Sequence, residues 1–573
     1  MLSFDCETGG LDPRHHNLIC VSSYDGSNSG LEFSNFGSLF DENTPKIGHN
    51  IKFDLTFLKY NGVEIRGEIH DTKLMAYLID PERKSTSLKD LAEELLGVSV
   101  IRFEDVCGKG KKQITFDKAM EQNPELATKY AKQDAELTYK LFHVLKEQMS
   151  STLWQLYTKL EIPLIRVLMD MEMSGIEIDT DYLDYLEKST RSEIWRALKN
   201  LRQYPHLNYN SPKQVGELLY NKLKLPKIKV TAKKQPSTDT EVLKQLEEKH
   251  PFPKYLLQYR DAKKRLSTYI EPIKEEAQQN EGKLYPHFNQ MVTATGRLSS
   301  SSPINLQNIP NRTASGRAIR RVFISKAVYV FVEADYAQIE PRIMAHCSRD
   351  PNLIKLFGTG SDLYTGVVAQ VLQLPEKEAE EKRALGKLLF LAMGYGAQPN
   401  KLVKAAKQND VDITEEEAGE FILRAEQTYS VLFQYKRSII NQARQLGYVT
   451  TLCGRVRHIR GLKDPNKWVR MEAERQAFNT VIQGSAADIM KMALLKLNRA
   501  GYDLKLTVHD SVLIELLDDE EALADIVAEA KLIMENIVKL RVPLKVDIKV
   551  GNNWGFEDLG FIGKNPLETR SLK

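Results

Sequence analysis

Acidic residues near the start of the chain recur at spacings that could gather carboxylates around divalent cations. Asp5 and Glu7 stand two residues apart after an apolar run, so both side chains point the same way if this segment is a strand. Asp54 and Asp134 each follow a polar side chain by four residues, a spacing that places the two groups on one helix face. Converging carboxylates can hold two divalent cations that activate water for phosphodiester hydrolysis. Each acid alone would also fit a surface position or a helix cap, but the four together predict a metal site.

A second acidic pair lies far apart in the sequence. Asp335 ends the apolar run Val328–Ala334, and Asp510 stands at the turn between Leu504–Val508 and Val512–Leu516. Strand-end aspartates can meet across a small sheet, where two metal ions about 3.5–4 Å apart would bridge a 3′-hydroxyl and a nucleotide α-phosphate. Phosphoryl transfer of this kind needs mainly positioning and neutralisation of charge.

Basic side chains between these aspartates are spaced for a triphosphate. Arg383, Lys387, Leu391 and Tyr395 follow one another at intervals of four, so on a helix they share one slowly rotating face. Arg383 and Lys387 would bind phosphates, and Tyr395, at the other end of this face, would contact a base or sugar. The segment alone would fit a solvated basic face equally well.

Other polar groups suit contacts with a nucleic acid. Arg475, Asn479 and Gln483 form a second ladder with a spacing of four, and their long side chains could reach minor-groove acceptors. The stretch 222–234 holds six lysines and no acid. Its ordinary interpretation is a solvated loop, and its alternative is contact with a phosphate backbone.

Bulk properties exclude several classes of protein. The 573 residues exceed a single core and suggest about four compact units. The five cysteines are scattered without a CxxC pair, which argues against a zinc ribbon or a disulfide framework and favours a reducing compartment. No apolar run approaches the length of about 18 residues that a membrane span needs, and no leader is evident. We therefore expect a soluble, cytoplasmic protein without membrane partners, and an organellar location stays open.

The elements that must position these residues follow from periodicity. Residues 1–150 alternate strand-like and helical patterns, which predicts an α/β sheet with its site at the strand ends. Residues 153–274 and 376–500 are mostly helical, and 291–312 is irregular chain. The individual elements expected in the first region are strands at 1–4 and 18–23 and helices at 72–79, 87–96 and 126–149.

The first acidic set resembles a known nuclease family. FDCETGGLD, IGHNIKFDLTFL and YAKQDAELTYKLF look like the three motifs of DEDD exonucleases of the subtype with tyrosine in the third motif. The resemblance implies a mixed sheet of the RNase H-like kind, Asp5, Glu7, Asp54 and Asp134 as metal ligands, and Tyr130 orienting the attacking water. The first motif begins almost at Met1, so a short strand could loosen the site.

The second set resembles family A DNA polymerases of the bacterial DNA polymerase I type. The resemblance runs from Asp5 to Trp554 and includes TGRLSS, NLQNIP, DYAQIE, the Arg-Lys-Tyr-Gly helix, QGSAADI and VHDS. It implies DNA synthesis with 3′→5′ proofreading. The implied fold is an α/β exonuclease domain at 1–150 followed by an α+β right-hand polymerase domain at 151–573. Its parts would be a thumb at about 155–290, a palm at about 291–355 and 480–573, and fingers at about 356–480.

Site roles follow from this resemblance, motif by motif. The metal ligands of the polymerase site would be Asp335, Asp510 and the carbonyl of Tyr336, and Lys387 would also act as catalytic acid toward pyrophosphate. The nucleotide would be bound by Tyr336, Gln338, Ile339, Glu340, Arg383, Lys387, Leu391 and Tyr395, with Glu340 excluding a ribose 2′-hydroxyl. The DNA contacts would be Arg297, Gln307, Asn308, Arg312, Arg475, Asn479, Gln483 and His509. The implied ligands are primer-template DNA, dNTPs and Mg²⁺, two ions at each site, with Mn²⁺ as a substitute.

Further expectations concern what accompanies the two activities. We expect a monomer without an N-terminal 5′ nuclease and without the thumb insertion that captures a processivity factor. The layout resembles virus-encoded, organellar and truncated bacterial enzymes. Two other functions stay open: a DNA-binding 3′→5′ nuclease with a polymerase-like module, and a single-subunit RNA polymerase, against which Glu340 and the exonuclease motifs argue.

Four positions depart from the family pattern. Leu391 stands where an aromatic residue usually meets the sugar, Ser511 where an acid often follows the aspartate, and Tyr364 where a triphosphate-binding histidine is frequent. Pro341 follows Glu340 directly and would stiffen the sugar-facing turn through its fixed φ.

The Leu391 departure predicts altered discrimination against nucleotides that lack a 3′-hydroxyl. Replacing Leu391→Tyr should raise the incorporation of dideoxynucleotides relative to dNTPs, measured as the ratio of the two kcat/KM values on one primer-template. An unchanged ratio would contradict the assignment of Leu391 to the sugar.

Overall fold

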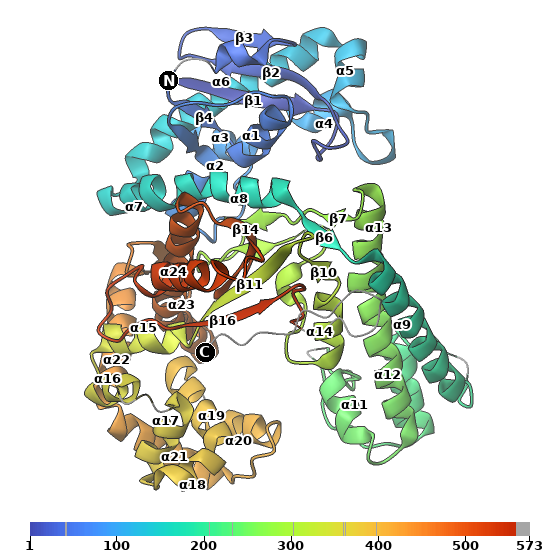
Figure 1. Cartoon of the computed structure of the whole chain (residues 1–573), viewed down its shortest axis with the longest axis vertical. Helices are drawn as coiled ribbons and strands as arrows, with labels where there is room; N and C mark the ends of the chain where they lie inside the picture. Colours follow the sequence, from blue (N-terminus) through green and yellow to red (C-terminus); the bar gives the residue numbers. More distant parts are fainter. Residues whose placement is uncertain are drawn as a thin grey trace.

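The computed structural model describes residues 1–40, 43–205, 207–231, 233–301, 303–358, 360, 362–396 and 398–556. Figure 1 shows an N-terminal α/β layer above a central sheet, from which two groups of helices extend on the opposite side. Among the helices of these described ranges, none has both the length and the apolar character needed to cross a bilayer.

The N-terminal layer is built on a mixed five-stranded sheet, as the sequence predicts. Its strand order is β3-β2-β1-β4-β5, antiparallel on the β3 side of β1 and parallel on the β5 side. The strands are β1 (Leu2–Thr8), β2 (Leu18–Tyr24), β3 (Ser29–Glu32), β4 (Lys46–Gly48) and β5 (Ile69–Asp71). The main helices of this layer are α1 (Ile51–Tyr60), α2 (Thr72–Ile79), α3 (Leu88–Leu96) and α6 (Pro124–Gln148).

Strand β1 is longer than the sequence suggests. The pattern predicts a strand at 1–4, but pairing with β2 continues through Glu7 to Thr8. Phe4 and Cys6 are buried and fix this strand in the core. Both acids of the first motif therefore lie within a central strand rather than after it, and the expected loosening of a short strand is not seen.

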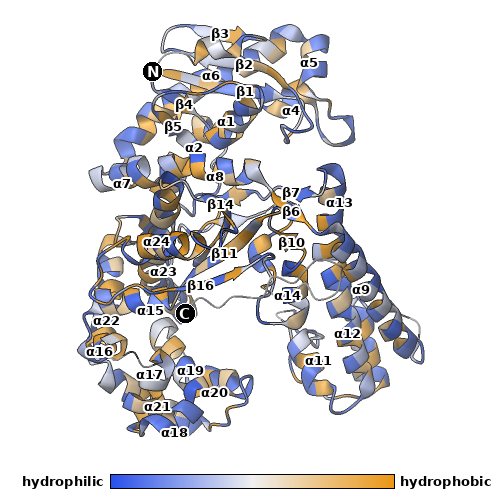
Figure 2. Ribbon diagram, in the orientation of Figure 1, coloured by the Kyte–Doolittle hydropathy of each residue, from blue (hydrophilic) through white to orange (hydrophobic). Residues whose placement is uncertain are grey.

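The central sheet has four antiparallel strands in the order β14-β15-β11-β16. They are β14 (Asp503–Val508), β15 (Ser511–Leu517), β11 (Tyr329–Tyr336) and β16 (Val546–Gly551), so the predicted hairpin around Asp510 is confirmed. Strand β11 is largely hydrophobic in Figure 2, and most of its residues are buried beneath neighbouring elements. The helices packed against this sheet are α8 (Ile162–Ser174), α23 (Lys467–Arg499) and α24 (Leu523–Glu535).

Two groups of helices extend from this sheet. The helical arm contains α9 (Thr180–Leu201), α10 (Pro212–Gly216), α11 (Thr240–Leu246), α12 (Pro251–Arg265) and α13 (Glu271–Gln279), and its tip has a separate hydrophobic core. The outer lobe contains α16 (Pro351–Gly358), α17 (Leu363–Leu372), α18 (Glu376–Glu381), α19 (Arg383–Tyr395), α20 (Pro399–Lys407), α21 (Glu415–Thr428) and α22 (Ser430–Leu446). An exposed ion pair joins arm and lobe, since Lys404 Nζ lies 2.8 Å from Glu241 Oε1.

A buried charge cluster lies where these parts meet. Glu161, just before α8, contacts Arg455, from the turn between β12 (Tyr448–Thr450) and β13 (Val456–His458). Lys491 Nζ lies 2.6 Å from the same glutamate, and Arg455 Nη2 lies 2.6 Å from Asp488 Oδ1. All four side chains are at most 3% exposed. Burial alone would raise the pKa of Glu161, but Lys491 and Arg455 outweigh it and lower that pKa to about 2.

The cluster makes stability depend on Glu161. Because the pKa of Glu161 is lower in the folded protein than its ordinary 4.5, its charge stabilises the fold fully above about pH 4.5. That contribution is lost as the pH falls from about 4.5 toward 2. Glu161→Gln leaves Arg455 and Lys491 buried without their full partner, so we expect a loss of about 3 kcal/mol in the free energy of unfolding near neutral pH.

Urea denaturation between pH 3 and 7 measures this effect, and the variant should also lose part of the wild-type acid dependence. The matched control is Glu82→Gln, since Glu82 pairs with Arg457 but is 28% exposed. That change should cost about 1 kcal/mol or less. Equal costs for the two variants would contradict the role given to the buried cluster.

Candidate active sites

The first candidate site gathers carboxylates from a strand and two helices. Oxygen atoms of Asp5, Glu7 and Asp134 all lie within 4.8 Å of one another. Asp54, on α1, stands beside them, and its Oδ1 accepts a hydrogen bond of 3.0 Å from the Cys6 amide. The structure thus brings together the acids that sequence spacing predicts, with Asp54 turned toward the β1 backbone.

These carboxylates repel one another in a buried setting. Burial, followed by the charges of Asp54, Glu7 and Asp134, raises the pKa of Asp5 well above its ordinary range. Burial likewise raises the pKa values of Glu7 and Asp54 to about 8 and that of Asp134 to about 6. Within the described residues, the buried Glu7 Oε1 has no hydrogen-bond partner. Clustered oxygen ligands with an unsatisfied acceptor fit a hard divalent cation such as Mg²⁺.

Two side chains near these acids were not singled out from the sequence. Lys89, on α3, forms an ion pair with Asp134 and lies 4.4 Å from the centre of the Tyr130 ring. Asp71 accepts hydrogen bonds of 3.0 Å from the amides of Asn50 and Ile51, and so fixes the start of the helix that carries Asp54. Tyr130 itself is hydrogen-bonded to Asp134. A lone lysine on an amphipathic helix gives no local signal of such a contact.

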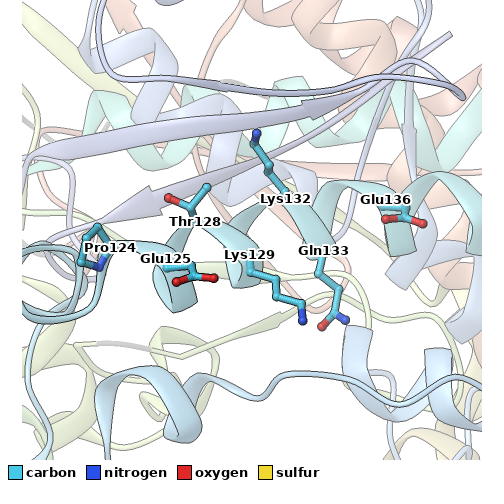
Figure 3. A pocket seen from close by; sticks show the side chains of 7 residues that line it. All are labelled: Pro124, Glu125, Thr128, Lys129, Lys132, Gln133 and Glu136. Atoms are coloured by element: carbon cyan, nitrogen blue, oxygen red, sulfur yellow. The ribbon is translucent and has the colours of Figure 1, made fainter.

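Two pockets lie near this site. The pocket in Figure 3, of about 660 Å³, is lined by one face of α6, including Lys129, Lys132 and Gln133. Tyr130 and Asp134 are buried on the other side of that helix, so this pocket does not contain the acids. A second cavity of about 400 Å³ lies between the N-terminal layer, α8 and the segment 285–291, with Asn50 in its lining.

The second candidate site lies at one end of the central sheet. Asp335 stands opposite Ser511 in the β11–β15 ladder, and the Tyr336 amide donates to the Asp510 carbonyl at 3.0 Å. The Tyr336 hydroxyl donates to the Met534 carbonyl at 2.9 Å, so only its main chain faces the two aspartates. Asp335 is solvent-exposed at the end of β11, but partial desolvation, followed by the charges of neighbouring acids, raises its pKa to about 6. Burial also raises that of Asp510 to about 6, although Arg297 opposes this.

Ser511 has a structural partner. Its hydroxyl donates to the Val508 carbonyl at 3.0 Å and closes the tight turn that presents Asp510. His509 in this turn has φ 55° and is exposed. The serine therefore supports the geometry of the hairpin, which an acid at this position would not do in the same way.

Arg297 connects Asp510 with Glu340, one of the sugar-facing residues predicted from the sequence. It forms an ion pair with Glu340 and approaches Asp510 Oδ1 at 3.9 Å. Glu340 lies in the first turn of α15 (Ile339–Ser348). This helix begins directly after Gln338, whose backbone is in the left-handed conformation. Ile339 is buried beneath this turn. The pairing of Arg297 with Glu340 was not predicted from the sequence.

Two more predicted DNA contacts flank this turn region. Gln307 donates to the Leu298 carbonyl at 3.1 Å, and Asn308 accepts from the Tyr269 hydroxyl through its carbonyl at 3.0 Å. The Asn308 side chain is exposed. The side-chain amide of Gln307 is therefore held by a backbone carbonyl, whereas Asn308 is fixed by its backbone and keeps its side chain exposed.

The four-spaced basic residues do lie on one helix, α19. Arg383, at its start, forms two hydrogen bonds with Asp362, of 3.0 and 2.9 Å. Burial, then the charges of Arg312 and Arg383, lowers the pKa of Lys387. Mutual repulsion of these three cations marks a position that an anion would stabilise. A Cβ on Gly386 would lie 1.9 Å from the Tyr364 carbonyl, so glycine allows α19 to pack directly on α17.

The remaining predicted contacts lie in the middle of α19 and along α23. Leu391 is 38% exposed. Arg475, Asn479 and Gln483 all lie on α23, and Arg475 forms an ion pair with Glu472. The Asn479 Oδ1 is buried without a hydrogen-bond partner in the described part of the chain. An acceptor of this kind is consistent with a ligand that supplies a donor.

Comparison with known proteins identifies the family. A family model described as DNA polymerase family A matches residues 180–556, and another described as 3′-5′ exonuclease matches residues 1–150. The chain belongs to DNA polymerase family A. The predicted order, an exonuclease domain followed by a family A polymerase domain, is confirmed.

Family A relatives resemble the chain over nearly all of its length. DNA polymerase I of Pseudomonas aeruginosa is 34% identical over 97% of this chain and 63% of its own length. DNA polymerase I of Geobacillus stearothermophilus is 36% identical over 90% of this chain and 58% of its own length. The chain thus spans about three fifths of these curated relatives. The solved POL domain of Pol1 from M. smegmatis, in complex with DNA primer-template and dNTP, matches with a TM-score of 0.85 at 30% identity, covering 97% of this chain and 95% of that one.

The buried carboxylate cluster makes a testable prediction about metal binding. In an Asp335→Asn background, Mn²⁺ at 100 times its Kd should stabilise the protein by about 2.7 kcal/mol through the first site. Adding Asp5→Asn should abolish most of this gain, and should raise the melting temperature in metal-free buffer because it removes one repelling charge. Thermal melting with and without Mn²⁺ measures both effects.

The control for this prediction is Glu125→Gln, at the exposed start of α6. It should leave the Mn²⁺ gain unchanged. A full Mn²⁺ gain in the Asp5→Asn protein would argue against a metal at this site.

Proposed function

We propose that the protein synthesises DNA on a template from dNTPs and removes mispaired 3′ ends with its N-terminal domain. The observation that carries the proposal is the pairing of two acidic sites in one chain. One stands at Asp335 and Asp510, and the other stands at Asp5 and its neighbouring acids, while α19 of the same chain carries Arg383 and Lys387. The family membership supports both activities.

At the polymerase site, the acidic groups would bind metal and the basic groups would bind the triphosphate. Asp335, Asp510 and the Tyr336 carbonyl would hold two Mg²⁺ ions, which when bound lower the pKa of the primer hydroxyl and stabilise charge on the phosphates. Arg383 would exchange Asp362 for the triphosphate, and Lys387 would bind it and donate a proton toward the leaving pyrophosphate.

The neighbouring residues of that site would select the substrate. Glu340, held by Arg297, would exclude a ribose 2′-hydroxyl, with Gln338 and Ile339 shaping the same wall. Leu391 would face the sugar, and Tyr395 would lie beside the templating position. Arg297 would exchange part of its ion pair for the primer terminus.

Minor-groove and backbone contacts would hold the DNA without reading its sequence. The residues proposed for this are Gln307, Asn308, Arg312, Arg475, Asn479, Gln483 and His509. Their donors match acceptors that all base pairs share in the minor groove. The lysine-rich stretch 222–234 in the arm would contact the phosphate backbone.

At the exonuclease site, Asp5, Glu7, Asp54 and Asp134 would hold two Mg²⁺ ions, for which Mn²⁺ can substitute. When bound, the ions activate water and stabilise the leaving 3′-oxygen. Tyr130, hydrogen-bonded to Asp134, would orient that water through its hydroxyl. The ammonium group of Lys89, on its flexible side chain, would then move away from Asp134 and leave this carboxylate free to bind metal.

The structural parts take the roles of a right hand in this proposal. The helical arm would be the thumb, the central sheet the palm, and the outer lobe the fingers, with limits near 155–290, 291–355 and 480–573, and 356–480. The exonuclease domain would end near residue 150. We further propose that the protein acts as a monomer in the cytoplasm and without a captured processivity factor.

Primer extension tests the proposal directly. Wild-type protein with dNTPs and Mg²⁺ should extend a primer and should use rNTPs at least about 100-fold less well, as expected for a steric gate at Glu340. Asp335→Ala should lower extension by at least about 1000-fold while 3′→5′ degradation continues. Failure of wild type to extend with dNTPs would reject DNA synthesis, and equal use of rNTPs would reject the steric gate at Glu340.

The excision activity is tested on the same primer without dNTPs. The double change Asp5→Ala with Glu7→Ala should stop 3′ degradation and leave extension intact. Degradation that survives this change would place the nuclease elsewhere.

A further inference from the structure

The C-terminal end of α19 is held by a lysine from another helix. Lys436, on α22, donates hydrogen bonds to the Met393 carbonyl at 2.9 Å and the Gly394 carbonyl at 3.0 Å. A Cβ on Gly396, just past the end of α19, would lie 3.5 Å from Lys436 Nζ. The ammonium group therefore occupies the position where α19 ends.

This contact answers a general need of helix ends. The last carbonyls of a helix have no partner within the helix, and its C-terminus carries partial negative charge. A cation there satisfies the carbonyls and interacts favourably with the helix dipole. For α19, the last turn is the one that continues to Tyr395, and Lys436 supplies the cation.

The surroundings of Lys436 keep it in place. Lys436 Nζ lies 5.3 Å from the centre of the Phe478 ring on α23. Lys436 also lines a cavity of about 220 Å³ next to α19, and Glu426 on α21 lines that cavity too. Apolar groups, including Leu389 and Ile422, form much of the remaining lining. A side chain that leaves this position would expose two carbonyls to an apolar cavity, which is costly.

The two ends of α19 are fixed independently. The N-terminal end is held by the Arg383–Asp362 pair and by the close packing of Gly386 on Tyr364. The C-terminal end depends on Lys436, about three helical turns away. A change at Lys436 should therefore affect one end of the helix and spare the other.

We propose that Lys436 is a positioning residue that fixes the C-terminal end of α19 and thereby the accuracy of base selection. The inference rests on the proposed polymerase function, in which Arg383 and Lys387 bind the triphosphate and Tyr395 stands beside the templating position. Lys436 touches no substrate and acts through the Met393 and Gly394 carbonyls.

Single-nucleotide insertion tests this role in a protein that carries Asp5→Ala with Glu7→Ala, so that excision does not mask errors. For Lys436→Met, the KM for the correct dNTP should stay within about twofold, because the triphosphate end is intact. The ratio of correct to incorrect kcat/KM should fall about five- to tenfold, as expected for losing charged hydrogen bonds at a helix end. Lys436→Arg, which keeps a charged donor, should recover most of the ratio.

The matched control is Lys355→Met, because Lys355 is an exposed lysine in the last turn of another helix of the same lobe, α16, and does not line this cavity. It should leave both KM and the ratio unchanged. A normal ratio in Lys436→Met, or an equal loss in Lys355→Met, would overturn the proposal.

Hydrogen–deuterium exchange separates this inference from the proposed function. In Lys436→Met, amides of 388–396 should exchange at least about fivefold faster. The amides of Gly386, which donates to the Lys382 carbonyl at 3.1 Å, and Lys387 should keep their wild-type rates. This measurement decides whether Lys436 fixes the end of α19 even if wild-type protein does not extend primers, an outcome that would reject the polymerase proposal and the link to base selection. If Lys436→Met does not fold, the same exchange comparison on Lys436→Gln applies, and unchanged exchange there would overturn the inference.

Discussion

The buried charges of Glu161, Arg455, Asp488 and Lys491 are the interaction on which the remaining architecture depends. They join the segment before α8, the β12–β13 turn and α23 at a point that water does not reach. Charges at such a position are tolerated only when each is paired, so the elements that carry them must meet in one arrangement. The Gln290 amide adds a hydrogen bond of 2.8 Å to Glu161 and attaches the segment that leads to Arg297.

That segment joins the N-terminal layer to the second candidate site. A Cβ on Gly296 would lie 2.5 Å from Arg455 Nε, so the turn rests directly on the charge cluster. The Tyr77 hydroxyl, from α2 of the N-terminal layer, donates to the Thr293 carbonyl at 2.8 Å, and the Thr293 hydroxyl donates to the Arg297 carbonyl at 2.7 Å. The N-terminal layer thus forms part of the support for the arginine that pairs with Glu340.

Sequence spacing predicted much of this arrangement, and the reason is local geometry. Helical intervals placed Arg383 and Lys387 on one face, and a turn between two apolar runs placed Asp510 in a hairpin. Spacing could not reveal partners that tertiary packing brings together: Glu161 and Arg455 are 294 residues apart, and nothing near either one indicates the other. The same holds for Lys89 and Asp134. The function of Ser511 was also hidden, because a hydroxyl that closes a turn looks in sequence like a missing acid.

The contact between Glu241 and Lys404 has a consequence for how the protein would engage and release a duplex. These side chains join the arm to the outer lobe and are 29% and 59% exposed. An exposed ion pair of this kind contributes about 1 kcal/mol or less and is screened by salt. This pair therefore holds arm and lobe together only weakly, and high salt would weaken the contact further. The grip on a long substrate would instead come from many weak contacts, and its lifetime would be set by ionic strength.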